Sequence, residues 1–187
     1  MNPKVTSEEE ILQTCREIVS KEGTDALNMR HIAEVQGIAL GSLYHYFPSK
    51  DAMITASVES VWQDIFHLRE DTKKVVPFDE YVKWLYACVK QSRIDYPNFS
   101  MSHSLSFASS AKKEARETMM RCFDQIKNGL SNSLEHDSNV LPAAFSRTFT
   151  KNDFIEFVFS SFFVSMIQGK DNCRTVIQVI DRCIYQK

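Results

Sequence analysis

The order of apolar and polar residues predicts helices along almost the whole chain. Between Ser7 and Gly23, apolar residues recur four and seven positions apart, which is the spacing of a single helical face. Ser7 and Glu10 form a capping-box pattern at the start of this segment, and Gly23 is expected to end it in the left-handed conformation. Similar patterns predict helices over 29–36, 40–46, 50–74, 77–96, 111–134, 153–168 and 173–184, with a short helical segment near 99–107. The expected fold is therefore all-α with about nine helices.

The boundaries in the second half follow from proline, glycine and capping residues. Pro77 is expected to open a helix, and Thr150 or Asn152 to cap the helix over 153–168. Gly169 should end that helix, and Asn172 should cap the last one. Residues 135–150 are polar and contain a proline, which favours a loop.

Composition limits the functional classes. The net charge of the 187-residue chain is −2, so any nucleic-acid binding must be local to one face. Five cysteines without metal-site spacing indicate free thiols rather than a disulfide framework. The N-terminus is polar, and the most apolar run, 154–167, is shorter than the roughly 20 residues that a transmembrane helix needs. These features predict a soluble, cytoplasmic protein without a membrane segment.

The stretch from Met29 to Asp51 has the pattern of a helix-turn-helix. Two short helices that cross steeply need a small side chain at the crossing, here Ala33, and a residue in the turn that accepts positive φ, here Gly37. Ile32, Ile38 and Leu43 would supply the apolar contacts between the two helices. The second helix, 40–46, is then the one expected to enter a major groove.

The same stretch resembles a known family. The run Gly-Ile-Ala-Leu-Gly-Ser-Leu-Tyr-His-Tyr-Phe-Pro-Ser-Lys-Asp-Ala-Met over 37–53, preceded by Asn-Met-Arg-His-Ile-Ala over 28–33, is similar to the signature of the TetR family of bacterial transcriptional regulators. The resemblance implies an N-terminal three-helix DNA-binding module, residues 1–50. It also implies a C-terminal helical bundle, residues 51–187, that binds a small-molecule effector and forms the dimer.

The resemblance also implies which side chains meet DNA. The positions carried over are Asn28, Arg30, Leu40, Gly41, Ser42, Tyr44, His45 and Lys50. Lys50 corresponds to a phosphate contact. Two positions depart from the family pattern: Ala39 replaces the usual Ser or Thr cap, and Leu40 stands where a polar residue is common. Either DNA is recognised partly through apolar contact with thymine methyl groups, or affinity is reduced.

The C-terminal part is rich in aromatic residues and methionine and carries a neutral charge balance, which favours a mostly apolar or aromatic effector. Candidate pocket residues are Trp62, Phe66, Trp84, Met101, His103, Phe107, Met119, Phe123, Phe159 and Phe163. Ordinary core packing remains the alternative for each of them. Asp64 and His67 share a helix face without a second such pair, so no metal site, cofactor or catalytic group is predicted.

The helix over 153–168 is apolar on more than one face, and the last helix adds a second apolar stripe. A second buried surface is therefore expected, and a homodimer through the last two helices would supply it, with Phe162 and Ile177 in the seam. A deep core helix within one chain is the alternative. A dimer presents two recognition helices to half-sites about 34–36 Å apart, which predicts a near-palindromic operator.

These expectations define a homodimeric, ligand-responsive DNA-binding transcriptional regulator, specifically a repressor released by its effector. Two other classes stay open. One is a helical small-molecule carrier or enzyme that keeps the module only as a scaffold. The other is an apolar-ligand sensor that acts through a protein partner. DNA binding separates both from a regulator.

Overall fold

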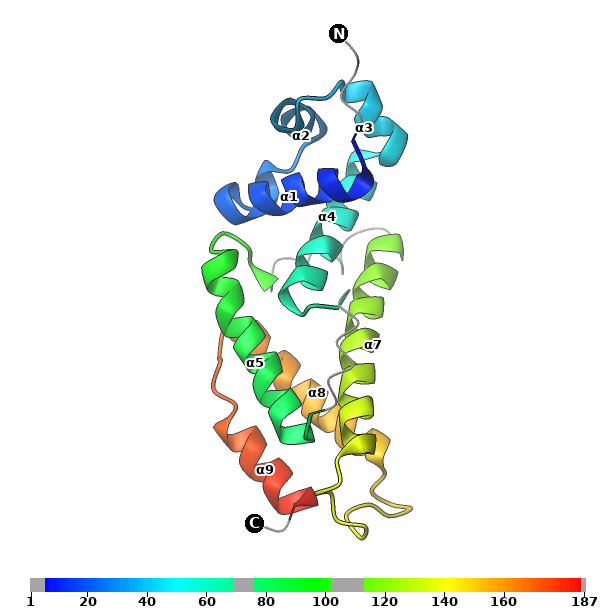
Figure 1. Ribbon diagram of the computed structural model, residues 1–187, viewed down its shortest axis with the longest axis vertical. Helices are drawn as coiled ribbons and strands as arrows, with labels where there is room; N and C mark the ends of the chain where they lie inside the picture. Colours follow the sequence, from blue (N-terminus) through cyan, green and yellow to red (C-terminus); the bar gives the residue numbers. More distant parts are fainter. Residues whose placement is uncertain (1–5, 69–75, 102–112, 186–187) are drawn as a thin grey trace. The chain divides into compact units, whose positions relative to one another are not determined.

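The computed structural model describes residues 6–68, 76–101 and 113–185. Within these ranges it contains α-helices and one short 3-10 turn, η1, and no strand, so the all-α prediction is confirmed (Figure 1). The helices are α1 (Glu8–Glu22), α2 (Met29–Gln36), α3 (Leu40–Tyr46), α4 (Lys50–Ile65), α5 (Phe78–Asp95), α7 (Lys113–His136), α8 (Lys151–Ile167) and α9 (Arg174–Ile184); η1 is Thr24–Ala26. Most of the segment predicted near 99–107 lies outside the described residues.

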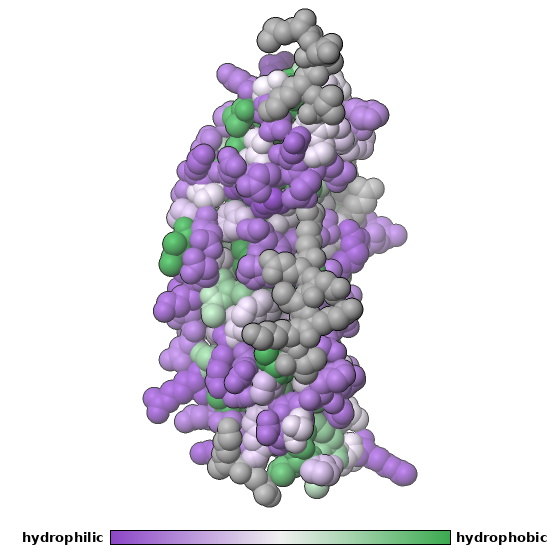
Figure 2. Space-filling view, viewed as in Figure 1, coloured by the Kyte–Doolittle hydropathy of each residue, from purple (hydrophilic) through white to green (hydrophobic). Residues whose placement is uncertain are grey.

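The chain divides into two compact units. The first comprises Met1–Ile65 with Ser92–Met119, and the second comprises Phe66–Gln91 with Met120–Lys187. Each has its own buried apolar core, and the face in Figure 2 is largely hydrophilic with small, separate hydrophobic areas. The functional division into residues 1–50 and 51–187 stays a prediction.

In the first unit, α1 is the central packing element. It contacts α4, α2 and η1, and α2 in turn contacts α3. Ile11, Cys15 and Val19 on its inner face have no exposed surface, as the predicted stripe requires. The capping box is also present: the Glu10 amide donates to Ser7 Oγ over 3.2 Å, and the Ser7 amide donates to Glu10 Oε2 over 3.1 Å.

Two further contacts in this unit join α1 and α4 to the segment at the end of α5. Asn98 Nδ2 donates to the carbonyls of Ser20 and Lys21, at 3.0 and 2.9 Å, and so caps the last turn of α1. The buried Tyr96 donates its hydroxyl to Asp64 Oδ2 on α4 over 2.6 Å. Together these contacts tie the end of α5 to α1 and α4. The three helices α1, α2 and α3 (residues 8–46) are referred to as the head.

The second unit is held by aromatic contacts and by one buried carboxylate. Phe162 on α8 packs edge-on against Phe66 and Tyr86, with ring centroids 6.0 and 5.3 Å apart. Asp137 follows α7 and accepts the amide of Phe78 over 2.8 Å at the start of α5. It also accepts the hydroxyl of Tyr185, directly after α9. One side chain therefore links α5, α7 and the end of α9.

Several predicted boundaries are wrong in detail. α4 ends at Ile65 rather than near residue 74, and His67 just beyond it has a φ of 48°. Gly23 has the expected positive φ, 86°, but its ψ of 172° lies outside the left-handed helical region. The N-cap of α9 is Cys173 rather than Asn172, although Asn172 Oδ1 still accepts the Arg174 amide over 2.9 Å. Thr150, of the two candidates, caps α8.

Phe162 does not lie where the dimer prediction put it. Its side chain is 1% exposed and belongs to the core of the second unit, so it is unavailable to a partner chain. Phe162 was misassigned because α8 is apolar on all sides, so the spacing of its apolar residues does not show which face packs against the core. The apolar residues that α8 does expose are Phe157, Val164 and Ile167.

Candidate nucleic-acid interface

The turn between α2 and α3 has the geometry predicted for a helix-turn-helix. Gly37 adopts φ 70° and ψ 35°, the left-handed conformation that ends α2. The Ile38 amide donates to the carbonyl of Ala33 over 3.0 Å, and Ala33 is 5% exposed at the crossing. Ile32 and Leu43 have no exposed surface. The turn therefore fixes α3 relative to α2 as expected.

The exposure along α3 separates an outer face from an inner one. Gly41, Tyr44 and His45 are exposed, and Leu40 and Ser42 are half-buried. Leu43 points into the core, and Phe47, directly after the helix, is buried too. Tyr44 is 48% exposed, a large fraction for an aromatic side chain. The outer face of α3 therefore presents side chains that the head core does not require.

Each remaining predicted DNA residue lies at a helix start. Asn28 caps α2 by accepting the His31 amide over 2.9 Å, and its Nδ2 donates to the Ala26 carbonyl over 3.2 Å. Arg30 and Lys50 are exposed in the first turns of α2 and α4. His31 Nε2 lies 3.2 Å from Glu22 Oε1, within hydrogen-bond distance.

A closed ring of hydrogen bonds, which the sequence did not reveal, braces the head. Glu10 Oε2 accepts the hydroxyl of Thr6 over 3.1 Å, and Thr6 Oγ1 accepts Gln36 Nε2 over 3.1 Å. Gln36 Oε1 accepts the hydroxyl of Thr14, which also donates to the Glu10 carbonyl over 3.1 Å. Tyr46 on α3 donates its hydroxyl to the Thr6 carbonyl over 2.5 Å. Thr6, which precedes the cap of α1, thus holds the ends of both α2 and α3.

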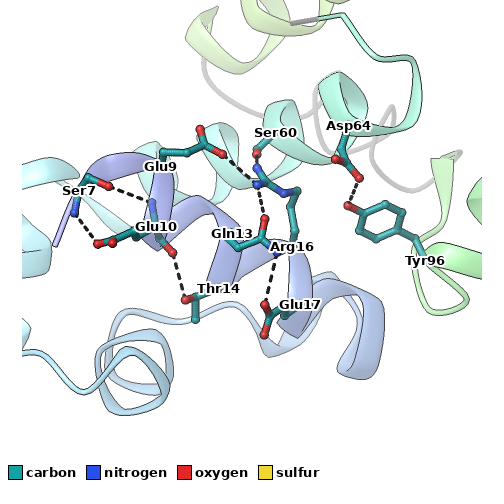
Figure 3. Close-up of polar contacts among 10 residues, drawn as sticks. All are labelled: Ser7, Glu9, Glu10, Gln13, Thr14, Arg16, Glu17, Ser60, Asp64 and Tyr96. Carbon is teal, nitrogen blue, oxygen red and sulfur yellow. Dashed lines mark hydrogen bonds and ion pairs between the residues drawn. The ribbon is translucent and has the colours of Figure 1, made fainter. Parts of the chain in front are cut away.

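Arg16 makes a second polar connection on the other side of α1. Its guanidinium lies 2.9 Å from Glu9 Oε1 and donates to the hydroxyl of Ser60 on α4 and to Gln13 (Figure 3). The arginine side chain is only 12% exposed. Arg16 is therefore a structural residue between α1 and α4 rather than a free cation for DNA.

The predicted effector residues divide between the two units. In the first unit Trp62 is fully buried, Met119 is 5% exposed and Met101 is half-buried. In the second unit Phe66 is 1% exposed, and the ring centroid of the half-buried Trp84 lies 5.2 Å from that of Tyr81 and 6.2 Å from that of His67. His103 and Phe107 lie outside the described residues.

Three of the predicted effector residues form one cluster. Phe123 on α7 lies 5.8 Å from the ring of Phe159 and 5.1 Å from that of Phe163, both on α8. The Lys127 ammonium lies 5.7 Å from the Phe159 centroid. The same ammonium contacts Glu156 and Asp124, at 3.2 and 3.4 Å. The cluster therefore offers an apolar surface whose adjoining cation is already neutralised.

Other chemistry is sparse in the parts of the chain that the structure describes. No group of three or more His, Cys, Asp or Glu side chains there could hold a metal ion. All five cysteines are free thiols, with Cys15, Cys88 and Cys122 buried, as expected. Burial raises the pKa of the Cys88 thiol to about 12, which disfavours its thiolate form. None of the described helices has both the length and the apolar character needed to cross a membrane.

Comparison with known proteins agrees with the geometry of the head. The family model described as "Bacterial regulatory proteins, tetR family" matches residues 11–56, which span α1, the helix-turn-helix and the start of α4. The N-terminal part of the chain is therefore similar to the DNA-binding region of the TetR family. The helical fold of the chain is shared with a TetR transcriptional regulator from Legionella pneumophila, with a TM-score of 0.61 at 19% identity, covering 98% of this chain and 100% of that one.

Relatives in sequence match less than a third of the chain. An uncharacterised HTH-type transcriptional regulator, YvdT of Bacillus subtilis, is 41% identical over 61 residues, covering 32% of this chain and 31% of that protein. The HTH-type transcriptional repressor KstR2 of Rhodococcus jostii is 35% identical over 57 residues, covering 30% and 28%. The matched segment thus spans about a third of the length of these curated relatives.

One further similar structure was solved with a ligand. The transcriptional regulator FadR of Bacillus subtilis, in complex with stearoyl-CoA, has a TM-score of 0.57 at 15% identity, covering 87% of this chain and 86% of that one. At this identity the likeness concerns the fold alone.

Proposed function

We propose that this chain is a homodimeric transcriptional repressor of the TetR family that binds DNA through α3 and releases it when a small apolar or aromatic effector binds the C-terminal part. The single observation that carries DNA binding is the outer face of α3. Gly41, Tyr44 and His45 are exposed on a helix that Leu43 fixes from behind, and they are not needed for packing. An exposed, rigidly held helix face is what major-groove recognition requires.

The proposal of a homodimer is supported by the apolar surface of α8. Phe157, Val164 and Ile167 are 50, 49 and 42% exposed, and their spacing of seven and three residues places them on one face. On α9, Ile177 is half-buried and Cys183 is exposed. A monomer that leaves this face in water forgoes about 25 cal/mol per Å² of apolar burial, which a second copy would supply.

The proposal of an apolar effector is supported by the cluster of Phe123, Phe159 and Phe163. The latter two rings are half-buried, so they retain surface for a ligand, and their neighbour Lys127 is paired with two carboxylates. That pairing removes the free cation that an anionic ligand would need. The stearoyl-CoA complex of the Bacillus subtilis FadR shows that a related fold holds a ligand with a long acyl chain.

The test of DNA binding starts with selection of a preferred duplex from a random library. An operator with two related half-sites is expected. Lys50→Ala should then weaken binding to operator and random duplex alike and reduce the salt-dependence slope by about two, roughly 0.9 for the phosphate contact of each copy in the dimer. Lys170→Ala, an exposed lysine beyond α8, is the matched control and should leave the slope unchanged. An unaltered slope in Lys50→Ala would contradict the assignment of Lys50 as a phosphate contact. Failure of the wild type to enrich any duplex would favour a carrier, an enzyme or a sensor that acts through a protein partner.

A further inference from the structure

The hydroxyl of Tyr46 turns away from the outer face of α3. Gly41, Tyr44 and His45 form that face, whereas Tyr46 is half-buried and donates to the Thr6 carbonyl over 2.5 Å. Its ring also stands edge-on to that of His45, with centroids 5.5 Å apart and an interplanar angle of 81°. Tyr46 therefore contacts both a fixed point outside the helix and a side chain of the outer face.

The fixed point is strongly held. Thr6 Oγ1 accepts Gln36 Nε2 and donates to Glu10 Oε2, both over 3.1 Å. Glu10 Oε2 is in turn bound by the Ser7 amide in the capping box of α1. Through Thr6, the last residue of α3 is therefore linked to the first turn of α1 and to the last residue of α2.

This connection compensates for a weakness at the other end of the helix. The N-cap residue of α3 is Ala39, whose side chain offers no hydrogen bond to the helix amides. With only seven residues, α3 cannot be stable by local interactions, because isolated helices need roughly 12–15 residues or more. Its pitch and rotation are set by contacts at its ends and by the burial of Leu43.

We propose that Tyr46 is a positioning residue for sequence recognition, acting through Thr6 on the outer face of α3 rather than by touching DNA. This inference rests on the proposed DNA-binding function. A hydroxyl that donates inward contributes no charge and no phosphate contact. The hydrogen bond from Tyr46 instead fixes the positions of Tyr44 and His45 relative to α1 and α2. Sequence discrimination, which depends on that placement, should therefore suffer more than general affinity for DNA.

The decisive experiment compares Tyr46→Phe with wild type on the selected operator and on a shuffled duplex of equal length, across a salt series. Loss of the hydroxyl should weaken operator binding about five- to thirty-fold, since each head of the dimer loses one hydrogen bond. Affinity for the shuffled duplex should change less than two-fold, and the salt slope should stay the same. Thr6→Val, which keeps the carbonyl that Tyr46 uses but opens the ring, should reproduce part of the loss of discrimination.

A matched control is available in the second unit. Tyr86→Phe removes a hydroxyl that donates to Ser165 Oγ over 3.3 Å, and its operator affinity should stay within two-fold of wild type. Equal losses on operator and shuffled duplex in Tyr46→Phe, or a reduced salt slope, would overturn the inference in favour of a direct backbone contact or a damaged head. Operator affinity within two-fold of wild type would also overturn it. A wild-type chain that enriches no duplex would instead defeat the proposed function itself, and this inference with it.

Discussion

Replacement of Asp137 by alanine should be among the most destabilising single changes in the second unit. The carboxylate is 8% exposed and accepts the amides of Phe78 and Asn139 over 2.8 and 2.9 Å, the side-chain amide of Asn139 over 3.1 Å, and the hydroxyl of Tyr185. Of these donors, the Phe78 amide belongs to the first turn of α5, so Asp137 acts as a helix cap supplied from outside that helix.

The magnitude follows from the donors that would lose their acceptor. The Phe78 amide and the Tyr185 hydroxyl are both buried, and each orphaned buried donor costs about 1–3 kcal/mol. Loss of a negative charge at a helix N-terminus adds roughly 0.5 kcal/mol. We therefore expect the free energy of unfolding to fall by about 3–5 kcal/mol, and the midpoint of thermal unfolding by roughly 10 °C. Tyr185→Phe should be milder, and the double variant should show strong coupling.

The pH dependence gives an independent check on the same carboxylate. Burial alone would raise the pKa of Asp137, but the hydrogen bonds from Tyr185, Phe78 and Asn139 together outweigh it and lower the pKa below the ordinary 3.8. The folded state therefore binds this proton less readily than the unfolded state. The stabilisation is fully present above that ordinary value and is lost as the pH falls below it toward the folded-state pKa.

Urea unfolding at neutral pH and at a series of acidic pH values measures both effects. Asp137→Asn, which keeps one acceptor oxygen but cannot ionise, should lack part of the acid sensitivity of the wild type. The reasoning would be refuted if Asp137→Ala lost less than about 1 kcal/mol, the lower limit for one orphaned buried donor. It would also be refuted if wild type and Asp137→Asn lost stability in parallel below about pH 4.

Two further substitutions test packing and assembly. In Gly129→Ala the new Cβ would lie 1.9 Å from the Tyr81 hydroxyl oxygen and 2.6 Å from its Cζ. Calorimetry should therefore show that the free energy of unfolding falls by about 1–3 kcal/mol, despite the better helix propensity of alanine. Unchanged stability would contradict this close approach of α5 and α7. Phe157→Glu, on the exposed face of α8, should convert the proposed dimer into a folded monomer, as measured by sedimentation. Ile94→Glu, at a residue 70% exposed on α5, is the control and should leave the dimer intact. A wild-type monomer at micromolar concentration would exclude the proposed dimer.

Features determined by neighbouring residues could be predicted from the sequence. The capping box of α1 was predicted because Ser7 and Glu10 need only a three-residue spacing, and Thr150 was one of the two candidates for the cap of α8. The left-handed Gly37 follows from the steric demand of a tight turn. The resemblance over 28–53 indicated the family for a similar reason, since it depends on a short contiguous segment.

Features that join distant residues could not be predicted in this way. Asp137 lies in a stretch that the sequence indicated only as a polar loop, and its partner Tyr185 is 48 residues away. Thr6 and Tyr46 are separated by 40 residues, and nothing in either local pattern indicates the other. Helical periodicity shows that a face is buried but not what covers it, which is why Phe162 was misassigned to a dimer seam.

The departure of this chain from the family pattern at Ala39 changes how its recognition helix has to be held. A Ser or Thr at that position would cap α3 from within and stabilise it by about 1 kcal/mol. Without that cap, the helix depends on the Ile38 amide at its start, the burial of Leu43 in its middle and the Tyr46 hydroxyl at its end. Because two of these three supports act outside the first turn, they would hold the proposed recognition helix although its N-terminus is uncapped and carries the apolar Leu40. Its orientation is then fixed from its carboxyl end.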